Sequence, residues 1–531
     1  MKDIIKEAIY NVVSEWVSID KIIVEIPKKR ENGDYSSNIC FVLSKVIKKN
    51  PLDIALNLKE QIDLKEIDKI EVKGGFLNFY LTKEFLFDNL NFILKQDENY
   101  GKNNIGNKMK INLEYVSANP TGILHIGHAR GASYGDSMAR ILKFCGYDVT
   151  REYYINDGGN QIINLEKSIK ARYDNLCGQE LVMPKDGYYG QEIIDIAKEI
   201  YDEYGKYANS ELFRNKGLEY LLSEIKKDLN NFKVEFDVWT SEQSLYDRKL
   251  VDKALKYLKD NGYTYEKDNA LFLKTSLYGD LKDRVLVKSD HTNTYLLPDI
   301  AYHIDKYNRG YDKMVDVLGA DHHGYVPRLK ASISMCGYDA SKLDVKILQM
   351  VRLIKDGEEV KMSKRTGKSL TMKDLIAMVG VDAVRYFFAA RSLDTQMDFD
   401  LNLATKKSSE NPVYYVSYAH ARICSIISDY GKGVNHNLKY TTINSDWAID
   451  LLFKMYQFED VVKLSAKTKE PHVITNYIYD LATLFHSFYA HEKILTDDDV
   501  YTSERINLIK GVKIIIKNAL NLIGVKAPDK M

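Results

Sequence analysis

The spacing of apolar and polar residues changes along the chain and predicts three successive kinds of structure. The first, over residues 1–97, is a small α+β domain in which strand-like runs at 70–72 and 76–80 flank a Gly-Gly pair. A helix follows at 83–94, and a polar, Gly- and Asn-rich stretch at 97–108 is a predicted linker. The N-terminal helix is expected to carry one apolar face, made of Ile4, Ile5, Ala8, Val12 and Trp16.

The second pattern predicts a doubly wound nucleotide-binding domain over residues 98–371. Residues 111–116 alternate as a strand, a Gly-containing loop follows, and a helix at 125–144 leads into a second strand at 149–155. Strand, loop, helix and strand in this order begin a parallel sheet with crossover helices.

Charged helical segments over about 166–261 interrupt this domain and predict an insertion, after which the sheet is expected to resume at 313–318 and 345–353. Residues 372–410 predict a helical connector, and residues 411–531 predict a helical C-terminal domain. The expected fold class is therefore α/β, with a Rossmann-type doubly wound parallel sheet between an N-terminal α+β domain and a C-terminal all-α helical bundle.

Composition narrows the class of protein. Of the 531 residues, 45% are hydrophobic and 28% are charged, which is typical of a soluble globular protein with several domains. Lys plus Arg and Asp plus Glu each total 75, so a polyanion would have to bind through local basic patches. No apolar run reaches the roughly 18 residues of a membrane span, so no membrane association is expected. The five cysteines are scattered without zinc-ligand spacing, which favours a cytoplasmic protein without zinc.

Two histidines follow the first strand and its loop. In His125-Ile126-Gly127-His128, both imidazoles lie where a helix is expected to begin, and helix N-termini attract phosphate oxygens. Gly127 leaves the backbone open to an adenine ring. By themselves these four residues do not distinguish an ATP site from a helix that merely contains two histidines and a glycine, but their position after a strand and the Gly122 loop favours an ATP site.

A second motif, Lys361-Met362-Ser363-Lys364-Arg365, follows a Gly-containing turn. Its three cations suit the binding of a pyrophosphate leaving group, on which negative charge develops in the transition state. Alone, such a cluster is more often a solvated basic turn. The two motifs in this order nevertheless predict adenylyl transfer from ATP. The expected catalytic residues are His125, His128, Lys361 and Lys364.

Both motifs resemble the signatures of the class I aminoacyl-tRNA synthetases, and nearly the whole chain resembles the arginyl-tRNA synthetase family. The resemblance implies a two-step ligase reaction, in which ATP and L-arginine give arginyl-adenylate and pyrophosphate, and the arginyl group then passes to the terminal ribose of tRNA(Arg). It also implies Mg²⁺ carried by ATP, and a monomer. The most specific matching stretches are 114–122, 154–161, 295–303, 319–324, 411–415 and 418–422.

The resemblance also implies roles for individual residues. Glu114 and Asp299 match positions that hold the guanidinium group, a planar cation that requires carboxylates able to accept paired hydrogen bonds. Asp299 is expected in a polar break after an apolar run. The positions implied for arginine binding are Glu114, Ser117, Asn119, His128, Gln161, Tyr295 and Asp299. Those implied for ATP binding are Gly122, His125, Gly127, His128, Asp321, His322, Lys361, Met362, Ser363 and Lys364. Three further residues either line the arginine or acceptor-end pocket or only tie its loop together: Tyr154, Asn156 and Asp157.

The expected RNA contacts lie in the terminal domains. Residues 411–531 resemble the family's anticodon-binding bundle, and residues 1–97 resemble its N-terminal tRNA-contacting module. Tyr414 and Tyr418 offer faces on which bases can stack, and Arg422 offers a phosphate or base contact. The chain contains 38 tyrosines, so this cluster is weak evidence by itself.

Two alternatives stay open. Another class I synthetase, such as the cysteinyl enzyme, would select its thiol substrate with a zinc site, for which the scattered cysteines are unsuited. A small-molecule nucleotidyltransferase could share the first signature, but such proteins are usually much smaller and lack a helical RNA-binding tail.

Overall fold

The computed structural model describes residues 1–360, 370–433 and 438–531, so the predicted motif at Lys361, Met362, Ser363 and Lys364 lies outside the described residues. The chain divides into two compact units. The first comprises Met1–Tyr100, Arg422–Phe458 and Leu481–Ile515. The second comprises Gly101–Ala421, Glu459–Asp480 and Ile516–Met531.

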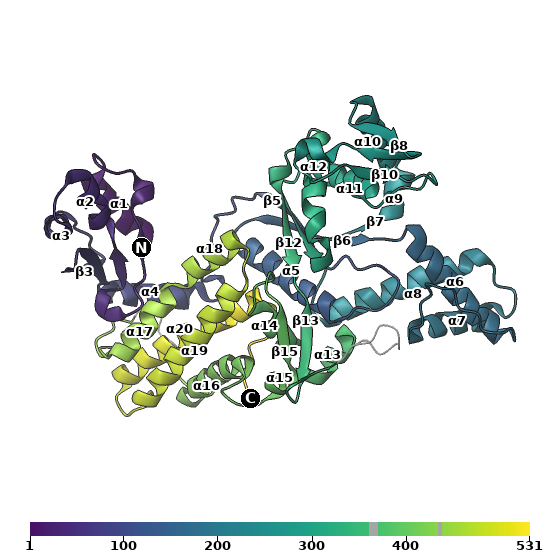
Figure 1. Ribbon diagram of the computed structural model, residues 1–531. Helices are drawn as coiled ribbons and strands as arrows, with labels where there is room; N and C mark the ends of the chain where they lie inside the picture. The colour runs from purple at the N-terminus through teal and green to yellow at the C-terminus, as the bar shows by residue number, and fades with distance from the viewer. Residues whose placement is uncertain (361–369, 434–437) are drawn as a thin grey trace. The chain divides into compact units, whose positions relative to one another are not determined.

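Residues Met1–Tyr100 contain a four-stranded antiparallel sheet, in the order β1-β2-β4-β3, with helices packed beside it (Figure 1). Helix α1 buries Ile5, Ile9 and Val13 and ends there, so the predicted apolar face is wrong in part: Ile4 and Trp16 are exposed. The elements are α1 (Lys2–Val13), β1 (Val24–Glu25), β2 (Tyr35–Ser37), α2 (Ile39–Ile47), α3 (Pro51–Gln61), β3 (Ile67–Lys73), β4 (Phe76–Leu81) and α4 (Lys83–Gln96).

A five-stranded, entirely parallel sheet lies at the centre of the second unit, which confirms the predicted doubly wound fold. The order of its strands is β12-β11-β5-β6-β7. The chain therefore adds β6 and β7 on one side of β5 and later adds β11 and β12 on the other side, which reverses the strand order at β5. Ligands bind at the carboxyl ends of the strands beside such a reversal. The strands are β5 (Lys110–Glu114), β6 (Asp148–Ile155), β7 (Val238–Ser241), β11 (Lys313–Gly319) and β12 (Leu343–Leu348).

The predicted insertion and the last predicted strand differ in detail from the structure. Helices α6 (Gly159–Leu176), α7 (Gln191–Tyr204) and α8 (Ser210–Asn231) lie together to one side of the sheet (Figure 1). Strand β7 then rejoins the sheet inside the range predicted as an insertion, because four residues are too few for a clear alternating pattern. The predicted strand at 345–353 is divided between β12 and β13 (Val351–Lys355), and β13 belongs to a separate sheet.

The other elements complete the chain. Between the insertion and β11 lie α9 (Glu242–Asp247), α10 (Leu250–Asp260), β8 (Thr264–Lys267), β9 (Ala270–Leu273), β10 (Arg284–Val287) and α11 (Leu296–Asn308). After β11 come η5 (Ala320–Tyr325), α12 (Val326–Met335), β14 (Glu358–Glu359), α13 (Met372–Val379), α14 (Val381–Ala389), β15 (Met397–Asp400) and α15 (Leu401–Thr405). The C-terminal helices are α16 (Pro412–Tyr430), α17 (Asp446–Tyr456), α18 (Phe458–Thr468), α19 (His472–His491) and α20 (Asp499–Leu522).

Helix α5 (Ile126–Phe144) packs unusually closely against the sheet. A Cβ atom added at Gly135 would lie 2.1 Å from the ring of Tyr115, so any larger residue would push the helix away from the end of β5. A Cβ atom at Gly131, one turn earlier, would meet its nearest neighbour at an ordinary 3.5 Å.

A buried arginine holds the same helix from its other side. The Arg130 guanidinium donates hydrogen bonds to the carbonyl oxygens of Gln349, Ser392 and Thr395, at 2.9, 2.7 and 2.9 Å. Together with the close contact at Gly135, these bonds set where the N-terminus of α5 lies relative to the strand ends.

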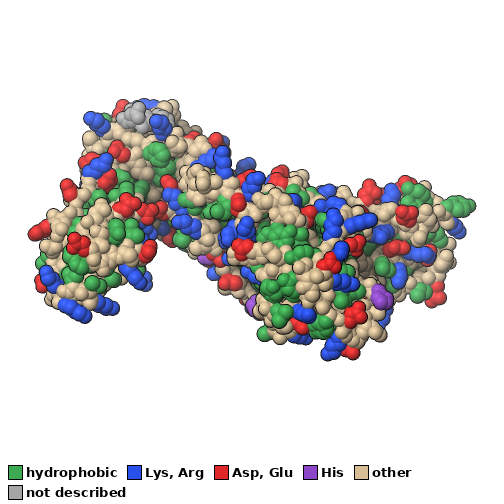
Figure 2. All heavy atoms as spheres, turned by 90° about the horizontal axis from the view of Figure 1, so that it is seen from above, with side chains coloured by type: hydrophobic (Ala, Val, Ile, Leu, Met, Phe, Trp, Pro, Cys, Tyr) green, Lys and Arg blue, Asp and Glu red, His purple; other side chains and the backbone are tan. Residues whose placement is uncertain are grey.

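Charged side chains of both signs are interspersed over the face shown in Figure 2, in keeping with the equal numbers of acidic and basic residues. Among the helices of the described residues, none is both long enough and apolar enough to cross a bilayer.

Candidate active site

A cavity of about 1300 Å³ opens at the carboxyl ends of the central parallel strands. The described residues predicted for substrate binding lie in its walls, with the single exception of Gly122. The predicted residues that line it are Glu114, Ser117, Asn119, His125, Gly127, His128, Gln161, Tyr295, Asp299, Asp321 and His322.

The loop after β5 has a strained backbone. Val116 and Ser117 have φ angles of 69° and 36°, and this left-handed region is disfavoured for a β-branched residue such as valine. The turn brings the Ser117 hydroxyl to Glu114 Oε1, to which it donates at 2.9 Å, while Ser117 Oγ accepts from the Tyr154 backbone N–H at 3.1 Å. The strained turn therefore holds the polar groups at the end of β5 in place before any ligand binds.

His125 and His128 stack at the N-terminus of α5, with ring centroids 3.7 Å apart. His125 Nδ1 accepts from the Gly127 backbone N–H at 3.1 Å, and His128 Nδ1 accepts from the His125 backbone N–H at 3.2 Å. Because each Nδ1 atom is an acceptor, a neutral ring carries its proton on Nε2, where it can donate to a phosphate oxygen. A Cβ atom at Gly127 would lie 3.0 Å from the His125 ring, so the glycine is also required by the stacked histidine beside it.

Glu242 and Asp299, both in the cavity wall, form no ion pair in the part of the chain that the structure describes, although the charges of His303 and His322 oppose the rise in the pKa of Asp299. Glu242 follows β7 and is buried, and the Tyr154 hydroxyl donates to its Oε2 at 2.9 Å. Burial raises the pKa of Glu242 to about 7, Tyr154 opposes this effect, and the charge of Asp299 adds to it. Asp299 lies in the first turn of α11, not in the predicted polar break, and accepts a hydrogen bond from Tyr325. Burial also raises the pKa of Asp299, and the Tyr325 hydrogen bond opposes that shift.

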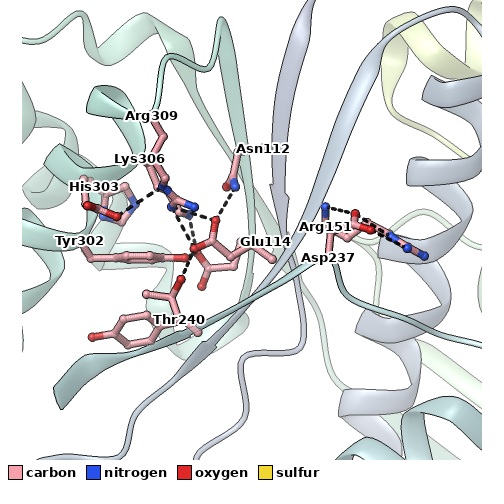
Figure 3. A network of polar contacts seen from close by, with 12 residues as sticks. Asn112, Glu114, Arg151, Asp237, Thr240, Tyr302, His303, Lys306 and Arg309 are labelled. Atoms are coloured by element: carbon pink, nitrogen blue, oxygen red, sulfur yellow. Dashed lines mark hydrogen bonds and ion pairs between the residues drawn. The ribbon is translucent and has the colours of Figure 1, made fainter. Parts of the chain in front are cut away.

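Three other carboxylates are already neutralised. Asp316 and Glu152 are the strand-register partners of Glu114 on either side, so the three side chains form one row across the sheet. Lys306 forms ion pairs with Glu114 and Asp316, and Arg309 reaches Glu152 at 2.9 Å (Figure 3). Burial disfavours the charge on Lys306, but these carboxylates outweigh it and raise its pKa. Glu114 is therefore paired with a cation of the protein, whereas Glu242 and Asp299 are left without an ion pair among the described residues.

The region after β11 also lines the cavity. Asp321 and His322 lie on η5 with exposed side chains, 84% and 48% accessible, and can contact a ligand directly. Both are in the position at a strand's carboxyl end where the sequence pattern predicts them.

Residues of the 154–161 segment divide into two groups. Tyr154, Asn156 and Gln161 line the cavity. Asp157 instead ties the loop to the start of α9, because its carboxylate accepts from the Ser241 hydroxyl at 2.6 Å and the Gln243 backbone N–H at 3.0 Å.

The residues predicted for RNA binding are on α16, and none of them is among the residues that line this cavity. The rings of Tyr414 and Tyr418 stack with centroids 6.2 Å apart, and the Tyr418 side chain is exposed. Arg422 donates to the Tyr489 hydroxyl, and its guanidinium lies 5.0 Å from the centre of that ring.

Three further residues of the cavity wall were not predicted as site residues from the sequence: Glu242, Tyr302 and Tyr325. Glu242 lies in the range predicted as an insertion, so its place directly after a strand of the sheet was hidden. A carboxylate that follows a short apolar run, Val238-Trp239, is the one signal that could have identified it. Tyr302 and Tyr325 act through hydroxyl contacts that depend on the tertiary fold.

Three family models match the chain in succession. They are described as "Arginyl tRNA synthetase N terminal domain" over residues 1–81, "tRNA synthetases class I (R), catalytic domain" over 89–388, and "DALR anticodon binding domain" over 416–531. The catalytic match contains every described residue of the cavity wall.

Whole-chain relatives agree with these models. The chain is 49% identical to the arginine–tRNA ligase of Bacillus subtilis (strain 168), over 100% of this chain and 99% of that protein. It is 48% identical to the arginine–tRNA ligase of Staphylococcus carnosus (strain TM300), over 97% and 95% of the two chains. Its fold matches the solved arginyl-tRNA synthetase of Thermus thermophilus with a TM-score of 0.79, at 21% identity and over 100% of both chains. The chain belongs to the arginine–tRNA ligase family, within the class I aminoacyl-tRNA synthetases.

Proposed function

We propose that this chain joins L-arginine to the terminal ribose of tRNA(Arg) at the expense of ATP, with the cavity beside α5 as its active site. The observation that carries the proposal is the pair of uncompensated carboxylates, Glu242 and Asp299, in a cavity that also holds the histidines of a helix N-terminus. Excess negative charge in a partly buried site favours a cation, and a phosphate-attracting helix end favours ATP.

The guanidinium group of arginine is placed between Glu242 and Asp299. Both carboxylates can accept paired hydrogen bonds from its N–H groups, which lie in the guanidinium plane, and the exposed ring of Tyr295 lies in the same cavity wall and can cover the side chain. Glu114 already pairs with Lys306, so we assign it, together with Ser117 and Asn119, to the α-ammonium end of the substrate. Gln161 completes this wall of the pocket.

ATP is placed with its phosphates at the N-terminus of α5 and its ribose near Asp321 and His322. His125 and His128 donate from Nε2 to the phosphates as negative charge builds there, and Gly127 keeps the approach open. The arginine carboxylate attacks the α-phosphorus, pyrophosphate leaves, and no side-chain nucleophile is required. Lys361 and Lys364 would stabilise the leaving pyrophosphate, with Met362 and Ser363 in the same motif and Gly122 in the adjoining loop. Mg²⁺ arrives with ATP as part of that substrate.

The remaining assignments concern the partner and the assembly. Tyr414, Tyr418 and Arg422 are proposed RNA contacts, supported by the stacked, exposed ring of Tyr418 and by the anticodon-binding domain that covers most of α16. The chain is proposed to act as a monomer in the cytoplasm, where tRNA is charged. Light scattering of the purified protein, alone and with tRNA, measures its molar mass and so tests whether it is a monomer.

The decisive experiment is aminoacylation with each of the twenty amino acids, with and without tRNA(Arg), and with pyrophosphate exchange followed in parallel. Charging of tRNA(Arg) by L-arginine alone is the expected result. Charging by another amino acid, or adenylate formation with a small molecule other than an amino acid, would overturn the assignment.

A further inference from the structure

Lys306 connects the wall of the cavity to the interior of the sheet. Its ammonium group is completely buried and binds Glu114 Oε2 and, at 2.8 Å, Asp316 Oδ1. Both carboxylates line the cavity, whereas Lys306 is not among the described residues of the wall. Lys306 can therefore influence a ligand only through the side chains that it holds.

Glu114 is held at both of its oxygen atoms. Oε2 accepts from Lys306 and, at 2.9 Å, from the Tyr302 hydroxyl, while Oε1 accepts from the Ser117 hydroxyl at 2.9 Å. The Lys306 ammonium also lies 4.4 Å from the centre of the Tyr302 ring. Donors on opposite sides leave the carboxylate a single orientation, with its Ser117 side beside the strained loop that lines the cavity.

The strand register makes a cation at this position necessary. Asp316, Glu114 and Glu152 lie side by side in one row, and three buried carboxylates would otherwise repel each other. Three residues spaced three apart along α11 and its C-cap face this row (Figure 3). His303 pairs with Asp316, Lys306 pairs with Asp316 and Glu114, and Arg309 pairs with Glu152. These three basic residues form a basic stripe that faces the row of carboxylates.

The members of this stripe differ in what they can affect. Glu114 lines the cavity and Glu152 does not, so Arg309 balances a carboxylate in the sheet interior, while Lys306 balances one that a ligand can reach. Removing Lys306 would leave Glu114 beside Asp316 without an intervening cation. One of the two would then take up a proton or turn toward water.

We propose that Lys306 is a positioning residue for amino-acid recognition: it keeps the Glu114 carboxylate ionised and oriented to receive the α-ammonium group of L-arginine. This inference rests on the proposed placement of that ammonium group at Glu114. Lys306 does not touch the substrate. Because Lys306 already pairs with Glu114, it also directs the guanidinium group of the substrate toward Glu242 and Asp299.

The test compares two ligands on the full-length protein by calorimetry: L-arginine and δ-guanidinovalerate, which is arginine without its α-amino group. Lys306→Met should weaken L-arginine binding by about tenfold to a hundredfold, as expected for a lost charge-assisted contact, and δ-guanidinovalerate binding by less than about threefold. Equal weakening of both ligands would show that Lys306 has only a structural role and would overturn the proposal.

Two further variants separate this inference from the proposed function. Arg309→Met removes the neighbouring, partly exposed cation without touching Glu114 and should affect both ligands equally. Glu114→Gln should weaken L-arginine selectively. If it does not, the placement of the α-ammonium group at Glu114 is wrong. If Glu114→Gln is selective and Lys306→Met is not, only the role of Lys306 fails.

Lys306→Met could unfold the protein, and thermal unfolding of each variant detects this. In that case two milder variants are used instead of Lys306→Met. Lys306→Gln keeps one hydrogen-bond donor for Glu114. Tyr302→Phe keeps the Lys306 cation but removes the hydroxyl that also donates to Glu114. Selective loss of L-arginine binding, smaller for Tyr302→Phe than for Lys306→Gln, supports the proposal. Equal loss for both ligands in these variants overturns it.

Discussion

The Tyr154 hydroxyl donates a hydrogen bond of 2.9 Å to Glu242 Oε2, and both side chains are buried at the edge of the cavity. This contact opposes the effect of burial, which raises the pKa of Glu242 to about 7. Glu242 is therefore a carboxyl group in the cavity wall whose charge changes near neutral pH.

Arginine affinity should rise with pH and level off above about pH 7. The guanidinium binds the ionised carboxylate, so below its pKa the binding of arginine must displace a proton from Glu242, and affinity falls by at most about tenfold per pH unit. Calorimetric titrations from about pH 5.5 to 8.5, in buffers of different ionisation enthalpy, measure both affinity and proton release. Glu242→Gln should bind more weakly and lose this pH dependence. Proton uptake by the wild type on binding would contradict the assignment.

Tyr154→Phe should move the same profile to higher pH. The variant removes the hydrogen bond that stabilises the ionised form of Glu242, so the pKa of that carboxyl rises further. Tyr153→Phe is the matched control, since its hydroxyl donates to the Ala118 carbonyl oxygen, at 2.9 Å, and not to Glu242. A shift of equal size in both variants would mean that the Tyr154 hydroxyl does not tune Glu242.

Asp299→Asn should weaken L-arginine binding by about a hundredfold and leave the KM for ATP nearly unchanged, because only the guanidinium loses a charged partner. Aminoacylation kinetics with each substrate varied in turn measure the two effects. Asp305→Asn makes the same change later in α11, where the carboxylate pairs with Arg248 at 2.9 Å outside the cavity, and should alter neither KM value. A larger loss for ATP than for arginine would show that Asp299 is misplaced.

His125→Asn should separate the helix cap from the chemistry. Asparagine is a good N-cap, so α5 keeps its first turn and the melting temperature stays close to that of the wild type. The Nε2 donor is lost, and kcat for adenylate formation should fall by about 100- to 1000-fold. His125→Ala should show the same loss of kcat with a lower melting temperature. Full activity in His125→Asn would exclude phosphate stabilisation by this ring.

Gly135→Ala should destabilise the protein by about 1–3 kcal/mol, since the added methyl group would lie 2.1 Å from the Tyr115 ring and must push α5 off the sheet. Gly131→Ala, on the same helix, meets ordinary contact at 3.5 Å and should be neutral or slightly stabilising. Denaturant unfolding of both variants measures the difference. Equal stability of the two would show that the close helix–sheet contact has no energetic importance.

Local pattern was sufficient for much of the fold. The structure has β5, α5 and β6 within two residues of the ranges predicted for them, because periodicity and turn residues act over a few neighbours. Strand β7 was not predicted, and the range 345–353 was predicted as one strand instead of two, since strands this short carry too few residues to show a period. Asp299 was predicted in a polar break after an apolar run, but it lies within α11, which begins at Leu296.

The sequence by itself determined the family, the order of the domains' structural types and the identity of most polar residues in the cavity wall. Only the tertiary structure decided which carboxylates are neutralised by the protein and which are left for a ligand. The sequence resemblance implies that Glu114 binds the guanidinium group. The parallel pairing of β5 with β11, however, puts Glu114 beside Asp316, where both carboxylates form ion pairs with Lys306 of α11. Charge compensation depends on distances of a few ångströms between segments far apart in the chain, and no local pattern encodes them.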